Sequence, residues 1–208
     1  EITNVNGRLF FRARDAGTNF ELWKSDGTAA GTALVKDIYA GNGGGAPGNL
    51  TNVNGILYFM ARSSAAGREL WKTDGTDAGT MLVKDINPGP DDSSPQNLTN
   101  VNGTLYFTAT DAVNGIELWK SDGTEAGTVL VKDINPGTDD SNPFYLNNTN
   151  GTLYFTATDA VNGIELWKSN GTEAGTVMVK DINPGMPSSA PLNLTSVNAE
   201  LYFVAKDE

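Results

Sequence analysis

Carboxylates are the side chains of this sequence that could do chemistry. The chain has 25 Asp and Glu residues against 14 Lys and Arg residues, with no His and no Cys. Two carboxylates placed on either side of a glycosidic bond can hydrolyse it. The lack of His and Cys excludes a Ser-His-Asp triad, thiolate nucleophiles, iron–sulfur clusters and disulfides.

One acid position lies in a loop that recurs along the chain and holds Asp26, Asp74, Asp122 and Asn170. Clustered oxygens of this kind could bind calcium. Alternatively, each side chain accepts a hydrogen bond from the backbone two residues on and fixes an Asx-type turn. Asn170 favours the turn, because an amide makes the same bond but brings no charge for a cation. We therefore expect structural turns at these four residues.

A second set of oxygen-bearing residues precedes each of the last two loops and comprises Asp111, Asn114, Glu117, Asp159, Asn162 and Glu165. Their spacing differs from that of an EF-hand. Calcium bound at these residues is a hypothesis, and we expect no other cofactor.

The four tryptophans are Trp23, Trp71, Trp119 and Trp167, and each interval between them is 48 residues. A large aromatic ring at one phase of a repeat could form a carbohydrate-stacking surface, or it could pack between repeats. We expect packing. The same two interpretations apply to the tyrosines at 58, 106, 154 and 202.

Departures from the repeat are the better place to seek a singular site, because most acids recur in phase. All five arginines lie within the first 68 residues. Arg12, Arg14 and Arg62 replace threonines of the later copies, so we hypothesise an anion or partner site there. The pair Phe144-Tyr145 is also off-pattern.

The elements that carry these residues follow from the 48-residue period, which divides the chain into 1–48, 49–96, 97–144, 145–192 and a partial fifth unit, 193–208. In the third copy, strands are expected at Asn97–Val101, Thr104–Thr110, Ile116–Lys120 and Thr128–Ile134. Asn102-Gly103 joins the first two, and Asn-Gly between apolar runs is a strong hairpin signal.

Four short strands in every such unit are typical of β-propeller blades. The fold class predicted is therefore all-β, a β-propeller built of four-stranded blades. The alternatives are another β repeat array, a solenoid and a β-sandwich. Residues 193–208 would supply only two strands of a fifth blade, so we expect the chain to continue in a longer protein or to join an assembly.

The segment Glu117–Thr124 reads ELWKSDGT and resembles the ELWxxDGT repeat family, with further copies at Glu21–Thr28, Glu69–Thr76 and Glu165–Thr172. The fourth copy departs from the pattern at Asn170. The resemblance implies a secreted or cell-surface bacterial protein, and it implies no defined activity.

The net charge of −11 and the sequence pI near 4.4 argue against nucleic acid and anionic membranes as partners. There is no apolar run long enough to insert into a membrane. Uniform repetition predicts a non-catalytic scaffold, not an enzyme, that makes structural or adhesive contacts with proteins or with copies of itself. The resemblance to the ELWxxDGT family implies that this scaffold is extracellular. The alternatives are a carbohydrate-binding propeller lectin and a sialidase-like glycoside hydrolase, either of which would have a glycan as partner.

Overall fold

The computed structural model describes residues 1–15, 17, 19–41 and 43–207, so Glu208, the last residue of the fifth unit, lies outside the described residues. The described residues form strands and turns, and no helix occurs among them. None of them therefore provides a helix long and apolar enough to cross a membrane.

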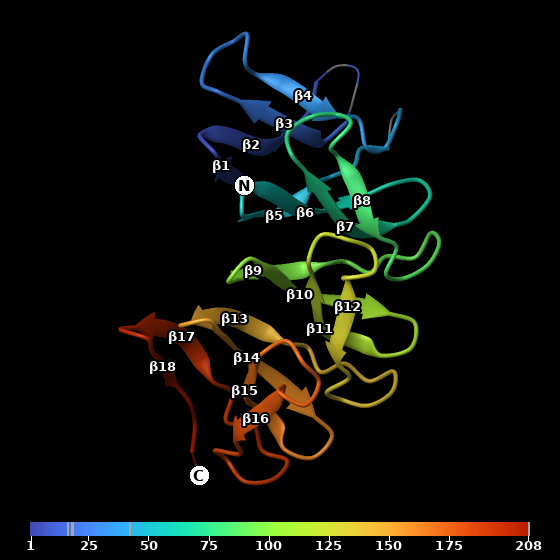
Figure 1. Ribbon diagram of the computed structural model, residues 1–208. Helices are drawn as coiled ribbons and strands as arrows, with labels where there is room; N and C mark the ends of the chain where they lie inside the picture. Colours follow the sequence, from blue (N-terminus) through green and yellow to red (C-terminus); the bar gives the residue numbers. More distant parts are fainter. Residues whose placement is uncertain (16, 18, 42, 208) are drawn as a thin grey trace. The chain divides into compact units, whose positions relative to one another are not determined.

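Four-stranded sheets follow one another along the chain, each with its strands in sequence order (Figure 1). The first two sheets contain β1 (Ile2–Val5), β2 (Arg8–Ala13), β3 (Glu21–Ser25) and β4 (Ala33–Lys36), then β5 (Gly48–Val53), β6 (Ile56–Arg62), β7 (Arg68–Thr73) and β8 (Met81–Lys84).

The next two sheets contain β9 (Gln96–Val101), β10 (Thr104–Asp111), β11 (Gly115–Ser121) and β12 (Val129–Lys132), then β13 (Phe144–Thr149), β14 (Thr152–Asp159), β15 (Gly163–Ser169) and β16 (Val177–Lys180). A two-stranded hairpin of β17 (Leu192–Val197) and β18 (Glu200–Val204) follows them. The predicted all-β fold of four-stranded propeller-type blades is confirmed. From the second blade on, each first strand begins one residue before the predicted boundary.

The described chain forms two compact units. The N-terminal unit contains Glu1–Leu98 and Gly123–Glu125, and the C-terminal unit contains Thr99–Asp122 and Ala126–Glu208. The boundary between the units thus falls within β9, the first strand of the third blade.

The Asn-Gly pairs form the hairpin turns between the first and second strands. Asn102 and Gly103 have φ of 51° and 87°, so both occupy the left-handed region that a two-residue hairpin of this type requires. Asn100 Oδ1 accepts a hydrogen bond from Gly103 N at 2.9 Å and closes the turn. The two hydrophobic runs on either side are thereby held in register.

The fourth strand of a blade is shorter than the sequence predicts. Residues Thr128–Ile134 were expected, and β12 spans only Val129–Lys132. Ile134 leaves the sheet because its N–H donates to Glu117 Oε2 at 3.0 Å. A buried side chain of the neighbouring strand, and not a β ladder, therefore directs the chain out of the blade.

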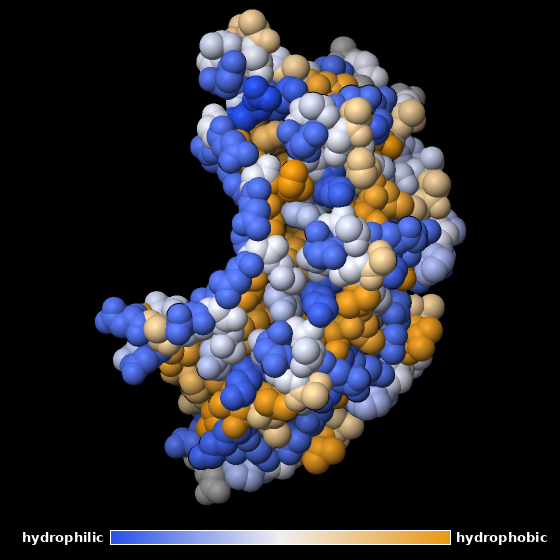
Figure 2. Space-filling view, in the orientation of Figure 1, coloured by the Kyte–Doolittle hydropathy of each residue, from blue (hydrophilic) through white to orange (hydrophobic). Residues whose placement is uncertain are grey.

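The core of each unit combines residues of successive blades. In the N-terminal unit, Trp71 of the second blade packs in one cluster with Phe10, Leu22 and Val35 of the first. In the C-terminal unit, Trp167 packs with Leu118 and Val131 in the same way, together with other buried residues of both blades. On the face drawn in Figure 2, hydrophobic side chains that remain exposed lie among hydrophilic ones.

Candidate functional site

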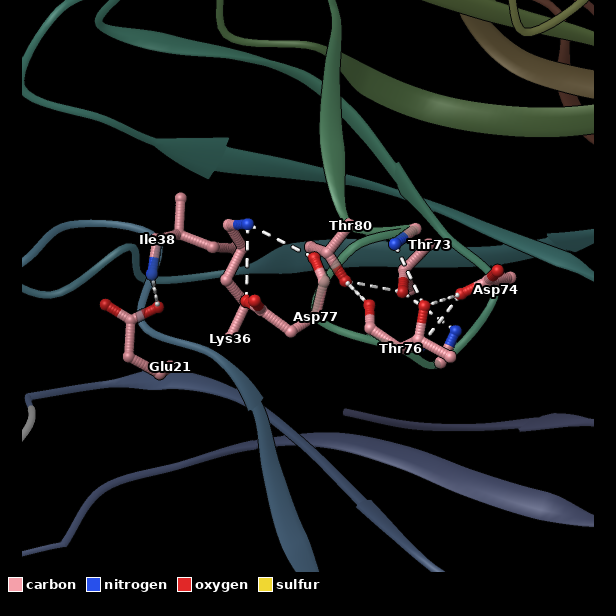
Figure 3. Close-up of polar contacts among 10 residues, drawn as sticks. Glu21, Lys36, Ile38, Thr73, Asp74, Thr76, Asp77 and Thr80 are labelled. Carbon is pink, nitrogen blue, oxygen red and sulfur yellow. Dashed lines mark hydrogen bonds and ion pairs between the residues drawn. The ribbon is translucent and has the colours of Figure 1, made fainter.

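The Asp-Gly-Thr loops are hydrogen-bonded turns. Asp74 Oδ1 accepts bonds from Thr76 N at 2.8 Å and from Thr76 Oγ1 at 2.7 Å (Figure 3). Asp26 and Asn170 make the same pair of bonds to the threonines two residues on. Asp122 occupies the same place, with its carboxylate over Gly127. These bonds are the ones that a turn role requires.

The same turns attach each blade to the one before it. Lys24 Nζ donates to Gly75 O at 2.6 Å, and Lys120 Nζ donates to Gly171 O at 2.8 Å. Lys36 Nζ adds a bond to Asp77 O at 3.1 Å and an ion pair with the Asp77 carboxylate at 3.3 Å (Figure 3). The repeated motif therefore couples a turn in one blade to lysines in the preceding blade.

The glutamate of each ELW sequence is fully buried, which the sequence alone did not reveal. Glu69 accepts bonds from Ile86 N at 2.9 Å and from Ser93 N at 3.0 Å, and Ser93 Oγ also donates to it. Burial raises the pKa of Glu69 to about 7, although these donors act in the opposite direction. Its carboxylate therefore holds the connection that leaves the blade.

The repeated aromatic rings are mostly buried. Trp71, Trp119 and Trp167 are 6–8% exposed, and Trp23 is half-buried. Tyr58 and Tyr106 are also buried, whereas Tyr202 of the last hairpin is exposed. A lectin that stacks sugars on one ring of every blade is incompatible with this burial.

The hypothesised calcium ligands have separate tasks. Asp111 Oδ1 accepts bonds from Val113 N and Asn114 N, and Asn114 Nδ2 donates to the same carboxylate. The Asp159 and Asn162 pair repeats these bonds. The carboxylates of Glu117 and Glu165 are instead buried against the connections that leave their blades.

Among the described residues, no group of three or more acidic side chains gathers as metal ligands do. Calcium binding stays a prediction, which calorimetric titration with Ca²⁺ would check.

The arginines proposed as a partner site fall into two places. Arg12 at the end of β2 and Arg14 just after it both lie over the ring of Phe20, with guanidinium carbons 5.2 and 5.5 Å from its centroid. Arg62 is exposed at the end of β6, opposite Arg68, which pairs with Asp92 at 2.7 Å. Arg14 corresponds to Thr110, the last residue of the strand predicted in the third copy, and it lies just outside β2.

A polar pocket of about 320 Å³ in the N-terminal unit brings together the acids of two turns and one arginine. We call it the Arg8 pocket, and its lining includes Asn6, Arg8, Phe10, Asp26, Gly55 and Asp74. Arg8 starts β2, directly after the first hairpin turn, and the two acids come from the loops that follow β3 and β7. These three turns meet at one edge of neighbouring blades.

The Arg8 pocket arises where the first repeat departs from the others. A Cβ atom built on Gly123 or Gly171 would collide with the hydroxyl of Tyr58 or Tyr106 in the blade before. At Gly75 the facing residue is Phe10, which has no hydroxyl, and Arg8 Nη1 lies 4.0 Å from such a Cβ. Comparing repeats position by position at residues 8 and 10 would have pointed to this site.

Both acids of the Arg8 pocket are held ionised. The hydroxyl and then the N–H of Thr28 lower the pKa of Asp26, and the charge of Arg8 adds a smaller effect in the same direction. The hydroxyl and N–H of Thr76 lower the pKa of Asp74, with a smaller effect from Lys24. The pocket therefore offers two carboxylates and one guanidinium at neutral pH.

Searches for related sequences found no matching family model and no curated protein. Among solved structures, a puromycin hydrolase matches with a TM-score of 0.50 and 13% identity, over 94% of this chain and 31% of that one. The chain thus spans about a third of the length of that protein.

Two further solved structures match with TM-scores of 0.41. An α-L-arabinofuranosidase from Clostridium thermocellum is 18% identical over 85% of this chain and 70% of that one. A protein described as an exo-β-1,3-galactanase from Bifidobacterium bifidum is 9% identical over 85% of this chain and 69% of that one. At these identities the likeness concerns the fold.

These comparisons contradict the expectation of a non-catalytic scaffold and of a protein that is not an enzyme. The puromycin hydrolase among these solved structures is an enzyme by name. Uniform repetition does not exclude a catalytic site, because a repeated fold can carry such a site where a single repeat departs from the pattern.

Proposed function

We propose that the chain is a carbohydrate-active protein of the glycoside hydrolase type and that the Arg8 pocket binds its sugar. The observation that carries this proposal is the convergence of Arg8, Asp26 and Asp74 on one pocket. The pocket is singular because Arg8 and Phe10 occur in the first repeat only.

The chemistry of the lining suits a sugar ring. Vicinal hydroxyl groups both donate and accept, so they pair with carboxylates and with the planar fork of a guanidinium. The Asn6 amide, which also lines the pocket, offers a donor and an acceptor. The volume of about 320 Å³ lies at the small end of ligand pockets, as expected for one ring and not for a long chain.

The two carboxylates suit the role of general base or nucleophile in glycoside hydrolysis. An ionised carboxylate can activate water or attack the anomeric carbon, whereas the partner acid must keep a proton near neutral pH. The lowered pKa values of Asp26 and Asp74 fit the first role and not the second. Substrates with activated leaving groups need no proton, so they isolate the step that this pocket can perform.

The test is turnover of a panel of 2,4-dinitrophenyl glycosides by the whole chain and by Asp26→Asn and Asp74→Asn. Asn170 makes the same turn as the acids, so these variants remove charge and keep the fold. We expect each to lower kcat/KM by roughly 100-fold or more, as loss of a catalytic base does. Because both pKa values are lowered, the rate should persist down to pH values below the ordinary range of an Asp side chain.

Asp122→Asn is the matched control, since it changes the same turn outside the Arg8 pocket, and it should leave the rate unchanged. The proposal fails if no glycoside of the panel is turned over. It fails equally if Asp122→Asn lowers the rate as much as the two pocket variants do.

We also infer membership of the ELWxxDGT repeat family and an extracellular, bacterial location, with a glycan as partner. Support comes from the in-phase copies of the motif, three of which match it in full while the fourth has Asn170 in place of Asp. Antibody labelling of intact bacterial cells that express the protein would test the location, and labelling only after lysis would contradict it.

A further inference from the structure

Two exposed aromatic residues of the C-terminal unit depart from the repeat. Phe144 and Tyr145 begin β13, and their side chains are 48% and 42% exposed. The other repeats have Gly48-Asn49, Gln96-Asn97 and Leu192-Asn193 at these positions. Unlike the repeated Trp side chains, this pair is singular.

The backbone at Tyr145 is suited to asparagine. Tyr145 has φ of 54°, and Asn49, Asn97 and Asn193 have φ of 57°, 55° and 56°. Asparagine tolerates this left-handed conformation, whereas a bulky side chain is strained in it. The tyrosine therefore costs the fold stability, and its ring has to be explained by what it does on the surface.

The two rings form one side of a pocket of about 260 Å³. They meet edge to face, with centroids 4.6 Å apart and planes at 76°. We call this the aromatic pocket, and its lining includes Asn142, Phe144, Tyr145, Thr158, Ile164 and Leu192. β14 and β15 supply Thr158 and Ile164, and Leu192 is the first residue of β17.

The lining determines which ligand fits. None of the described residues that line the aromatic pocket is charged, so the lining offers no ion pair to a charged ligand. The rings and Ile164 offer apolar contact on one side, while the Asn142 amide and the Thr158 hydroxyl offer hydrogen bonds. A pyranose or furanose ring has this character, with a C–H face and a hydroxyl edge.

We propose that the aromatic pocket binds one uncharged sugar ring in contact with Phe144 and Tyr145, as a second carbohydrate site of the chain. The inference rests on the proposed function, in that it assumes a carbohydrate ligand. It requires no turnover, so binding at the aromatic pocket and hydrolysis at the Arg8 pocket can fail separately.

The test uses NMR titration of the whole chain with methyl glycosides of neutral sugars, and with methyl glucuronide as a charged comparison. Neutral glycosides should shift the ring resonances of Phe144 and Tyr145, and methyl glucuronide should bind at least 10-fold more weakly. In the double variant Phe144→Gln and Tyr145→Asn, which copies Gln96-Asn97, the affinity should fall by 10-fold or more.

The same double variant should raise the midpoint of thermal unfolding by about 2–4 °C, because the left-handed position regains its asparagine. Opposite effects on stability and binding separate a ligand site from a merely structural role. Tyr202→Asn is the matched control, since it removes an exposed tyrosine of the same unit outside the pocket, and it should leave binding unchanged.

Three results would overturn the proposal. The first is that no neutral glycoside shifts the ring resonances of Phe144 or Tyr145, either at 50 times the protein concentration or at millimolar concentrations in excess of the protein. The second is that only aromatic compounds such as phenol bind. The third is that the ring resonances change with protein concentration alone, which would assign the surface to self-association.

Discussion

At the scale of single residues, the buried glutamates of the ELW sequences connect stability to pH. Glu21, Glu69, Glu117 and Glu165 have no exposed side-chain surface. Burial raises the pKa of Glu21, and it raises the pKa of Glu69 and Glu117 from the ordinary 4.5 to about 7. In the unfolded chain the same groups would titrate near their ordinary value.

We expect the free energy of unfolding to decrease as the pH rises from about 4.5 to 7. Between these values the folded chain holds protons on Glu69 and Glu117 that the unfolded chain has released, so raising the pH favours unfolding. The contribution of each group is fully present below its ordinary pKa and is lost as the pH passes its folded pKa. Each contributes on the order of 3 kcal/mol. Urea denaturation across this pH range measures the change.

Glu117→Gln should reduce that slope, because it removes one of the titrating groups. It should also destabilise the fold at all pH values by about 1–3 kcal/mol, since the new amide N–H₂ faces donors at Ile134 and Ser141. Glu173→Gln, at an exposed side chain of the same unit, is the control. An unchanged slope in Glu117→Gln would mean that this carboxyl does not titrate in the range.

At the scale of elements, the Asp-Gly-Thr turn of one blade fits against a tyrosine of the blade before. Gly171 has φ of 85°, and any Cβ there would meet Tyr106 Oη. Gly137 has φ of 101° with no atom within 4 Å of a Cβ. Comparing an alanine substitution at Gly137 with one at Gly171 therefore separates the cost of backbone strain from the cost of disturbing the contact between blades.

Gly137→Ala should lower the free energy of unfolding by about 1–2 kcal/mol, from the left-handed backbone alone. Gly171→Ala should cost a further 1–3 kcal/mol or so, because the turn is pushed away from Tyr106. Adding Tyr106→Phe should restore part of the second loss, as Phe10 faces Gly75 in the first blade. Chemical denaturation of the three variants measures these losses, and equal losses at both glycines would refute the contact.

At the scale of the whole molecule, the described blades differ in how completely they are covered. β17 and β18 form a sheet of two strands, and Tyr202 and Val204 are 55% and 63% exposed. A two-stranded hairpin is marginally stable without further strands or a packed face. The hairpin should therefore open more readily than the four-stranded blade that precedes it.

Hydrogen exchange measures that difference. Amides of β18 should exchange on the order of 100-fold faster than those of β14, which is paired on both sides, because local opening needs fewer contacts to break. β16, an edge strand of a complete blade, is the control and should be intermediate. Equal protection of β18 and β14 would show that the hairpin is covered in solution.

Much of the fold could be predicted from the sequence because its signals are local. The Asn-Gly turns, the alternating strands and the 48-residue phase each depend on neighbouring residues, and the strands lie within a few residues of the expected places. The early end of the fourth strand could not be predicted, since it depends on Glu117, which lies 17 residues before Ile134.

The candidate sites were harder to predict, because each depends on contacts between separate turns. The sequence proposed Glu117 as a calcium ligand, and the structure shows its carboxylate buried against Ile134 and Ser141. The Arg8 pocket was missed, although early arginines were recognised as departures, because Asp26 and Asp74 recur in phase and looked purely structural.

By itself, the sequence determined the repeat, the strands and the turns, because side-chain periodicity and the φ preferences of Asn and Gly act over a few residues. Only the tertiary structure decided which side chains are buried and hydrogen-bonded within the fold and which line a pocket. Burial and the meeting of turns from different blades depend on packing between repeats, and no single repeat encodes it. The Phe10 ring takes the place of a tyrosine opposite Gly75, and only the packing of the two blades brings Arg8, Asp26 and Asp74 to one pocket.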